Sequence, residues 1–465
     1  MDCISRGGAV GRRPRRLLPR AAGALALLAL AGCAGPGLGA RYRALEEDWR
    51  RSAAGPLASS ATPGAGEDPF AGAGSLVRED LVGEVLRRNP SLHAARHAWR
   101  AALARYPQAT SLDDPMLGLS AAPRSFDSRA VNDAWRVDVG QAFPFPGKLA
   151  LRGEIALAEA EATADDFEAV RLRLAAMASL LHDDLYVAAR AVEINAQHVE
   201  LVEELHGIAL ARYEAGEGSA NDPLQAEVEL AHILHDDISL RTAERVAREQ
   251  INALLHRRPD APLPPPPPAL ELPPLDGADR AARLEAALAE QPELRAAEAR
   301  IRSKEAAVAL ARREFLPDVT LMAAYDRIWQ ERELQPMVGL QVNVPLRLAR
   351  RRAALDEARA ELERAKSERA SVEDDVLLGV ASGLDRFAEA HHIHELYRDR
   401  LLPATRDQVE AARAAFETGR TSFLAVIDAE RNLRRVELGY EQALADASRR
   451  HAELERASGR LAGQR

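Results

Sequence analysis

Apolar residues recur at alternating steps of three and four between Lys148 and Tyr213, a stretch that contains no proline. The positions that share this spacing are Phe167, Val170, Leu174, Met177, Leu181, Leu185, Ala188 and Val192. The spacing is typical of helices that pack side by side in coiled coils. A helix of about 60 residues, rising about 1.5 Å per residue, reaches about 100 Å. Such a helix needs other helices along its length.

The same pattern returns after Pro345, and the next proline is Pro403. The apolar positions that repeat the alternation are Leu355, Ala358, Leu362 and Ala365. The sequence therefore predicts a second long helix.

Four short segments alternate instead with the period of two expected of a strand. Their apolar positions are Leu117 and Leu119; Trp135, Val137 and Val139; Val319, Leu321, Ala323 and Tyr325; and Val338, Leu340, Val342 and Val344. Strands of about ten residues fit the tilted crossing of a membrane barrel, with the apolar face toward lipid. The alternative from pattern alone is two soluble hairpins on a helical body.

Four strands cannot close a barrel, so a lone chain would leave open sheet edges. Each unpaired backbone group at such an edge costs several kcal/mol in hydrocarbon. Strands that enter a membrane therefore require several protomers to share one barrel.

The chain repeats itself at a nearly constant offset. The matched stretches are Asn89–Leu92 with Gln291–Leu294 (292 minus 90 gives 202), Val137–Pro144 with Val338–Pro345 (201), and Tyr213–Gly216 with Phe416–Gly419 (203). Because turns, strands and helices all recur in one register, the sequence predicts an internal duplication.

The beginning of the chain is rich in arginine, then apolar, and ends in Leu30-Ala31-Gly32-Cys33. This order is typical of a lipoprotein signal. We expect residues 1–32 to be removed and Cys33 to carry a covalent lipid, the only attached group that the sequence indicates. Cys3 would lie in the removed segment, so the mature protein would have no internal disulfide.

The composition and the breaks in pattern give the expected segments. These are a signal peptide (1–32), a lipidated tether (33–75) with a short helix around Arg41 to Arg50, a first repeat (76–258), a proline-rich linker (259–275), a second repeat (276–459) and a C-terminal tail (460–465). The prolines of the linker favour an extended, stiff connection.

Charge and hydropathy exclude some classes of function. The chain has 62 basic and 71 acidic residues, a formal net charge of −9, which argues against nucleic acid as a partner. No stretch after the signal offers 18 consecutive apolar residues, so the sequence predicts no transmembrane helix.

The chain resembles the TolC-like outer-membrane efflux family from about Leu76 to Gly459. The residues that carry the resemblance are Gln141-Ala142-Phe143-Pro144-Phe145-Pro146-Gly147-Lys148 at the end of a strand, and the paired Tyr/Phe-Glu-x-Gly turns before Leu/Ile-x-Ala-Glu. The resemblance implies a mainly α-helical fold with a small β part: a duplicated coiled-coil α-barrel, and four strands per protomer in a shared 12-stranded barrel of a homotrimer. It also implies an outer-membrane location with most of the mass in the periplasm, a periplasmic adaptor protein and an inner-membrane pump as partners.

The strand-to-helix corner has a physical basis of its own. Pro144 and Pro146 lack the donors a sheet needs, Gly147 lets the backbone turn into the helix, and Pro345 ends the corresponding strand of the second copy. We expect these four residues to form the corners between strands and long helices.

The family pattern also assigns roles at the far ends of the helices. The adaptor-docking tips would be Tyr213, Gly216, Leu224, Phe416, Gly419 and Ile427. Gly216 and Gly419 also fit ordinary helix C-caps. A ring of Asp428 carboxylates would narrow the pore, with Asp222 and Gln225 in the matching places of the first copy, whereas Ala425 departs from a second acidic position of the family. A solvated surface is the alternative for these polar residues.

Candidate chemistry is weak elsewhere. His391, His392 and His394 lie beside Glu395, but adjacent helix positions point in different directions. His391 with His394 or Glu395 has the spacing of a ligand pair, which is a weak signal, so we expect a solvated face rather than a metal site. His182 with Asp183 and Asp184 is interpreted in the same way. No phosphate loop or nucleophile motif is present in the sequence, so no enzyme is predicted.

The predicted function is the outer-membrane channel of a tripartite efflux system, a passive trimeric duct. The FPFPGK motif resembles that of family members that work with metal-cation pumps, and this resemblance alone favours metal-cation export. The alternative is a periplasmic coiled-coil adaptor or scaffold lipoprotein without a pore.

Overall fold

The computed structural model describes residues 36–54, 70, 72–127, 129–275, 279–329 and 331–461. The predicted signal peptide and Cys33 lie outside these ranges. The described chain divides into two compact units: a first unit with residues up to 45, 102–159 and 302–363, and a second unit with residues 46–101, 160–301 and 364 onward. None of the described helices is both long and apolar enough to cross a membrane.

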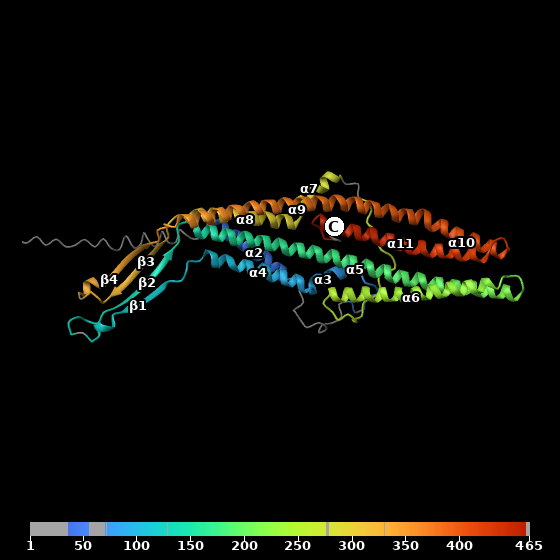
Figure 1. The fold of residues 1–465 in the computed structure, drawn as a ribbon, viewed down its shortest axis with the longest axis horizontal. Coiled ribbons are helices and arrows are strands. Elements are labelled where there is room, and N and C mark those ends of the chain that lie inside the picture. Colours follow the sequence, from blue (N-terminus) through green and yellow to red (C-terminus); the bar gives the residue numbers. More distant parts are fainter. Residues whose placement is uncertain are drawn as a thin grey trace, which may run out of the picture. The chain divides into compact units, whose positions relative to one another are not determined.

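Helices dominate, and the only strands among the described residues form one sheet (Figure 1). The elements are α2 (Pro36–Ala54), α3 (Arg78–Arg88), α4 (Pro90–Thr110), β1 (Met116–Ala121), η1 (Pro123–Ser125), β2 (Trp135–Phe143), α5 (Lys148–Glu214), α6 (Asn221–Leu254), α7 (Arg280–Glu290), α8 (Pro292–Arg313), β3 (Val319–Asp326), η2 (Arg332–Leu334), β4 (Pro336–Val342), α9 (Leu348–Leu396), η3 (Tyr397–Leu401), α10 (Leu402–Glu417) and α11 (Phe423–Ala457). The mainly helical fold with four strands confirms the predicted fold class.

The second long helix is interrupted where the first is continuous. Helix α5 runs for 67 residues, whereas α9 ends at Leu396 and passes through the π-helical turn η3 into α10. Pro403 explains the interruption, because its nitrogen cannot donate within the helix and its ring would collide with the preceding turn. A wider turn relieves that collision. Gly439 of α11 leaves room for the ring of Tyr397, since a Cβ at this position would lie 2.7 Å from Tyr397 Cε1.

The sheet lies in the first unit and is antiparallel throughout, in the order β1-β2-β3-β4. Its strands have six, nine, eight and seven residues, so the expected length of about ten residues was wrong. Prolines limit the ladders: β1 lies between Pro115 and Pro123, β2 stops before Pro144, and β4 begins at Pro336. A proline nitrogen cannot donate to a ladder.

The described helix within the predicted N-terminal tether is longer than the expected short helix around Arg41 to Arg50. Helix α2 has 19 residues, and in the first unit its Leu38, Tyr42 and Leu45 pack against Tyr106 and Leu157. The rings of Tyr42 and Tyr106 stack with centroids 4.7 Å apart. These contacts make α2 part of the folded body, because the apolar residues on one face of α2 are too many to leave in water.

The proline-rich linker packs on the second unit rather than hanging free. The carbonyl of Pro265 accepts a hydrogen bond from the backbone of Leu76 at 2.8 Å. Leu270 is buried with Tyr186, Leu444 and Ala445. The linker therefore covers apolar surface as well as joining the repeats.

The first strand-to-helix corner is built around a buried lysine. Lys148 Nζ lies 2.9 Å from Asp318 Oδ1, 3.3 Å from Glu314 Oε2 and 3.2 Å from the carbonyl of Leu316. The backbone N–H of Phe145 also donates to Asp318, at 2.7 Å. The end of β2 is thereby fastened to the segment that enters β3.

Gly147 has the conformation that the corner requires. Its φ is +87°, and a Cβ there would lie 1.8 Å from Arg313 Nη1, which donates to the carbonyl of Pro146. Both the backbone angle and the space therefore demand glycine. At the second corner, Pro345 is followed by Leu346, which is 82% exposed, and by exposed Arg347.

Replacing Lys148 with Met should lower the free energy of unfolding by about 2 kcal/mol, because two carboxylates and a carbonyl would lose their shared cation. The measurement is denaturant unfolding of the purified protein. Lys304→Met is the matched control, since Lys304 pairs with Glu361 at 3.4 Å on the surface and should matter little. Equal losses for the two variants would contradict a special role of Lys148.

Candidate functional site

One face of the sheet is apolar across all four strands. The pairs Leu117↔Val139, Val139↔Ala323 and Ala323↔Val338 lie directly opposite each other and therefore share a face. The other members of this face are Leu119, Ala121, Trp135, Val137, Gln141, Phe143, Val319, Leu321, Tyr325, Leu340 and Val342, among which Gln141, opposite Leu321, is polar. Leu117 and Leu119 are 78% exposed and Val338 is 90% exposed. No part of the chain that the structure describes covers these side chains.

The opposite face carries small and polar residues, including Gly118, Ser120, Asp138, Thr320 and Gln341. The two outer strands, β1 and β4, each pair on one side only within the described chain. Their outer backbone groups form two open edges, which are templates for pairing with another strand.

The two long helices end in matching turns in the second unit. Gly216 and Gly419 have φ angles of +75° and +70°. The N–H of Gly216 donates to the carbonyl of Tyr213 and that of Gly419 to the carbonyl of Phe416, both at 3.0 Å. The next residues donate to the carbonyls of Arg212 and Ala415, at 2.9 and 2.8 Å. These are Schellman caps, so each glycine serves the turn itself.

The predicted tip residues divide into buried and exposed ones. Phe416 and Ile427 lie in a core with Phe423, Val426, Ala226, Leu205 and Ala209, and Ile427 is 1% exposed. Arg212 joins the two turns, because its guanidinium stacks 4.6 Å from the centroid of the Phe416 ring and donates to the Phe416 carbonyl at 2.8 Å. Phe416 and Ile427 therefore hold the tips together, whereas Tyr213 and Leu224 are exposed.

The predicted constriction residues lie close to these tips. Asp428 is exposed in the first turns of α11, and one of its oxygens lies 3.3 Å from Arg431 Nη1. Asp222 accepts a 3.4 Å hydrogen bond from the N–H of Ser219 at the start of α6. Gln225 has a buried Oε1 without a hydrogen-bond partner. Ala425 is half-buried and supplies no charge.

A line of charged residues along α11, which we name the polar seam, was missed in the sequence. It consists of Glu430, Arg431, Arg434, Glu437 and Glu441. Glu430 pairs with Arg413 of α10 at 2.8 Å, and Arg431 pairs with Glu229 of α6 at 2.5 Å. The other three residues have partners on α5: Arg434 contacts Asn195 at 3.0 Å, Glu437 contacts His198 at 3.1 Å, and Glu441 contacts Tyr186 at 2.6 Å. Glu430, Arg434, Glu437 and Glu441 follow one another at steps of four, three and four, and this spacing was the signal that could have revealed the polar seam.

Burial changes the acidity of the groups in the polar seam. Burial raises the pKa of Glu430, and Arg413 only partly offsets this effect. Burial opposes ionisation of Glu437 too, but the hydrogen bond from His198 and the charge of Arg406 outweigh it, so its pKa is lowered. Burial and the hydrogen bond to Glu441 raise the pKa of Tyr186.

His182 and Asp183 are buried and have structural partners, contrary to the expected solvated face. His182 Nε2 lies 3.0 Å from the carbonyl of Leu76, and Asp183 pairs with Arg78 at 2.6 Å. Asp184 pairs with Arg449 at 2.7 Å. These contacts join α5 to α11 and to the chain at the start of α3.

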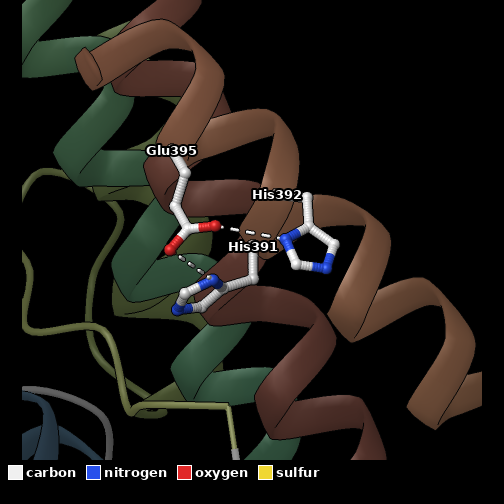
Figure 2. Close-up of side chains that lie close together, drawn as sticks. All are labelled: His391, His392 and Glu395. Atoms are coloured by element: carbon white, nitrogen blue, oxygen red, sulfur yellow. Dashed lines mark hydrogen bonds and ion pairs between the residues drawn. The ribbon is translucent and has the colours of Figure 1, made fainter.

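The histidines of α9 do not act as one group. His394 is buried, with its ring 5.3 Å from that of Tyr440, and both its ring nitrogens lack hydrogen-bond partners. Burial lowers its pKa. His391 and His392 instead both face Glu395 (Figure 2). From the sequence, Glu395 was considered as a partner of His391 alone and was not combined with both His391 and His392.

Most of the chain is similar in fold to solved outer-membrane channels. The outer-membrane channel OprN is 22% identical, with a TM-score of 0.68 over 87% of this chain and 98% of that one. VceC from Vibrio cholerae is 18% identical, with a TM-score of 0.69 over 82% and 96%. The open-state MtrE channel from Neisseria gonorrhoeae is 18% identical, with a TM-score of 0.66 over 82% and 89%. No curated protein matches the chain in sequence.

The family described as outer membrane efflux protein matches residues 81–256 and residues 284–460, which together make up most of the chain. This match confirms the predicted family, the outer-membrane location and the assignment as a channel protein rather than an enzyme. The chain belongs to the outer membrane efflux protein family.

Proposed function

We propose that this protein is the exit duct of a tripartite efflux system: a passive homotrimer in which three copies share a 12-stranded barrel. The observation that carries the proposal is the exposed apolar sheet face between two open edges. An apolar face of this kind suits lipid, whereas open edges do not, because unpaired backbone groups are costly in hydrocarbon. Pairing β4 of one copy with β1 of the next satisfies both requirements.

The internal repeat suggests the register of that pairing. In one hairpin Leu117 pairs with Val139, and in the other Leu321 pairs with Leu340. The offset is 201 for the second strand of each hairpin (340 minus 139) and 204 for the first strand (321 minus 117). Val139 therefore corresponds to Leu340 (139 plus 201), and Ala323 corresponds to Leu119 (323 minus 204). Because Val139 pairs with Ala323 within the chain, the repeat predicts that Leu340 pairs with Leu119 of the next copy. Both residues belong to the apolar face, so the face would continue from copy to copy.

The corners support the same arrangement. Asp318, which accepts from Phe145 and Lys148, corresponds to Asp114 at the offset of 204. Asp114 is exposed before β1, and the second corner presents exposed Leu346 and Arg347. We infer that Asp114 of one copy fastens the second corner of its neighbour, as Asp318 fastens the first.

The remaining partners are proposed from the family and the tips. An adaptor would dock at the helix ends, where Tyr213 and Leu224 are exposed, and an inner-membrane pump would supply the energy. A covalent lipid on Cys33 would add a second attachment to the membrane. The preference for metal cations as substrate rests on the FPFPGK wording of the corner alone.

Cysteines at Ser120 and Gly339 should cross-link neighbouring copies. The proposed register places Gly339 opposite Ser120 on the polar face, within the Cα separation that a disulfide tolerates. Oxidation of the Ser120→Cys/Gly339→Cys double variant should give covalent trimers on denaturing gels. Ser120→Cys/Gln341→Cys is the control, since it shifts one cysteine by two residues on the same face. Stronger linking by the control would overturn the register.

Purified protein should form pores in planar lipid bilayers. Steps of single-channel conductance are expected from the unaltered protein. Val338→Asp should reduce insertion, because it would put a charge on the face proposed to meet lipid. Absence of conductance from correctly folded trimers would reject the duct and favour a scaffold role.

Asp428→Asn should weaken block of the pore by divalent cations, because it would remove three carboxylates from the proposed constriction. The readout is the divalent concentration that halves conductance. Asp446→Asn is the control on the same helix, since Asp446 is also exposed and also pairs with an arginine, Arg449. Unchanged block in Asp428→Asn would remove Asp428 from the constriction.

A further inference from the structure

The last full turn of α9 brings two imidazoles and a carboxylate together. His392 Nδ1 lies 3.1 Å from one oxygen of Glu395, and His391 Nδ1 lies 3.7 Å from the other. One ligand atom from each of the three residues lies within 4.8 Å of the other two. Figure 2 shows the Glu395 carboxylate between the two rings.

Helix geometry explains why these residues meet. Successive residues are separated by about 100° around the helix axis, so His391 and His392 diverge. Glu395 lies one helical turn after both histidines, four residues from His391 and three from His392. Its direction around the helix axis is therefore between the directions of the two histidines. The carboxylate therefore reaches both rings, while His394 points away toward Tyr440.

The two imidazoles of the cluster differ in burial. The Nδ1 atom of His391 is buried and has no hydrogen-bond partner, and the ring lies edge-on to Phe387 at a centroid distance of 6.1 Å. His392, on the outer side, is exposed. The hydrogen bond from His392, together with the nearby imidazoles and Arg398, holds the pKa of Glu395 below its ordinary value, so the carboxylate is charged at neutral pH. Arg398 itself pairs with Asp399 at 2.7 Å.

We propose that His391, His392 and Glu395 bind a divalent transition-metal ion of the Zn²⁺ class. Two imidazoles and one carboxylate are a common zinc ligand set, with water in the fourth position. The same ligands suit Cu²⁺ and Ni²⁺, whereas Mg²⁺ and Ca²⁺ prefer oxygen ligands alone. Ligand atoms of a tetrahedral zinc lie about 3.3 Å apart, so closure requires a movement of up to about 1.5 Å. The exposed side chain of His392 is free to make it.

Metal binding here would join residues of one helical turn directly before η3. The ion would thus stabilise the end of α9 at the point where the second long helix changes to a wider turn. This site is independent of the proposed duct, since neither the barrel nor the constriction enters the argument.

The test is a titration of full-length protein, purified without a histidine tag, with Zn²⁺ followed by calorimetry and with Co²⁺ followed by visible absorption. One saturable ion per chain is expected at the site, with no competition from excess Mg²⁺. His392→Gln and Glu395→Gln should each weaken binding on the order of tenfold or more. His97→Gln on α4 and Glu357→Gln on α9 are matched controls, since both residues are exposed and lie outside the cluster.

A second measurement separates loss of the site from loss of the fold. Zn²⁺ should raise the melting temperature of the unaltered protein and of the two controls, but not that of the triple variant His391→Gln/His392→Gln/Glu395→Gln. Circular dichroism should show equal helix content for all of them. Saturable binding that survives in the triple variant, or the absence of binding by the unaltered protein, would overturn the proposal.

Discussion

The register of the four-stranded sheet is the constraint on which the rest of the structure depends. Side chains alternate between faces with a period of two, so a slip of one residue in any ladder would move every apolar side chain of that strand to the other face. The pairs Leu117↔Val139 and Ala323↔Val338 keep all four strands in phase. Lys148 and Asp318 fasten the end of β2 to the entrance of β3, so the strands from the two repeats are aligned where they join.

The long helices must also keep one position relative to one another along their axes. Long helices rich in alanine and leucine can slide past one another with little change in buried apolar area. The polar seam of α11 prevents this, because Glu437 and Glu441 find their partners on α5 at one relative position only. Buried charges of this kind add little net stability, and they penalise every other register. The buried core that contains Phe416 and Phe423 packs the ends of these helices together.

Much of the architecture could be predicted from periodicity. The bounds of α5, the four strands and the two glycine turns followed from local patterns that tertiary contacts did not override. The lengths of the strands could not be predicted from alternation, because prolines such as Pro115 and Pro123 end the ladders early. The roles of Phe416 and Ile427 were also beyond sequence, since only the meeting of two distant turns buries them. The i, i+4 spacing indicated His391 with Glu395, but the grouping of both His391 and His392 around Glu395 was not predicted, because each pair was considered separately.

The π-helical turn at Tyr397–Leu401 affects the helix length between the corner and the cap of the second repeat. The offset between the halves is 201 at the corners (345 minus 144) and 203 at the caps (419 minus 216), so the later copy carries two additional residues along its helix. A turn closed by i→i+5 bonds holds one more residue than an α-turn while adding little length. One of the two additional residues is therefore accommodated at η3 with little added helix length, and Arg212 still contacts the Phe416 ring at the caps. The wider turn thus compensates for one inserted residue between the corner and the cap of the second copy.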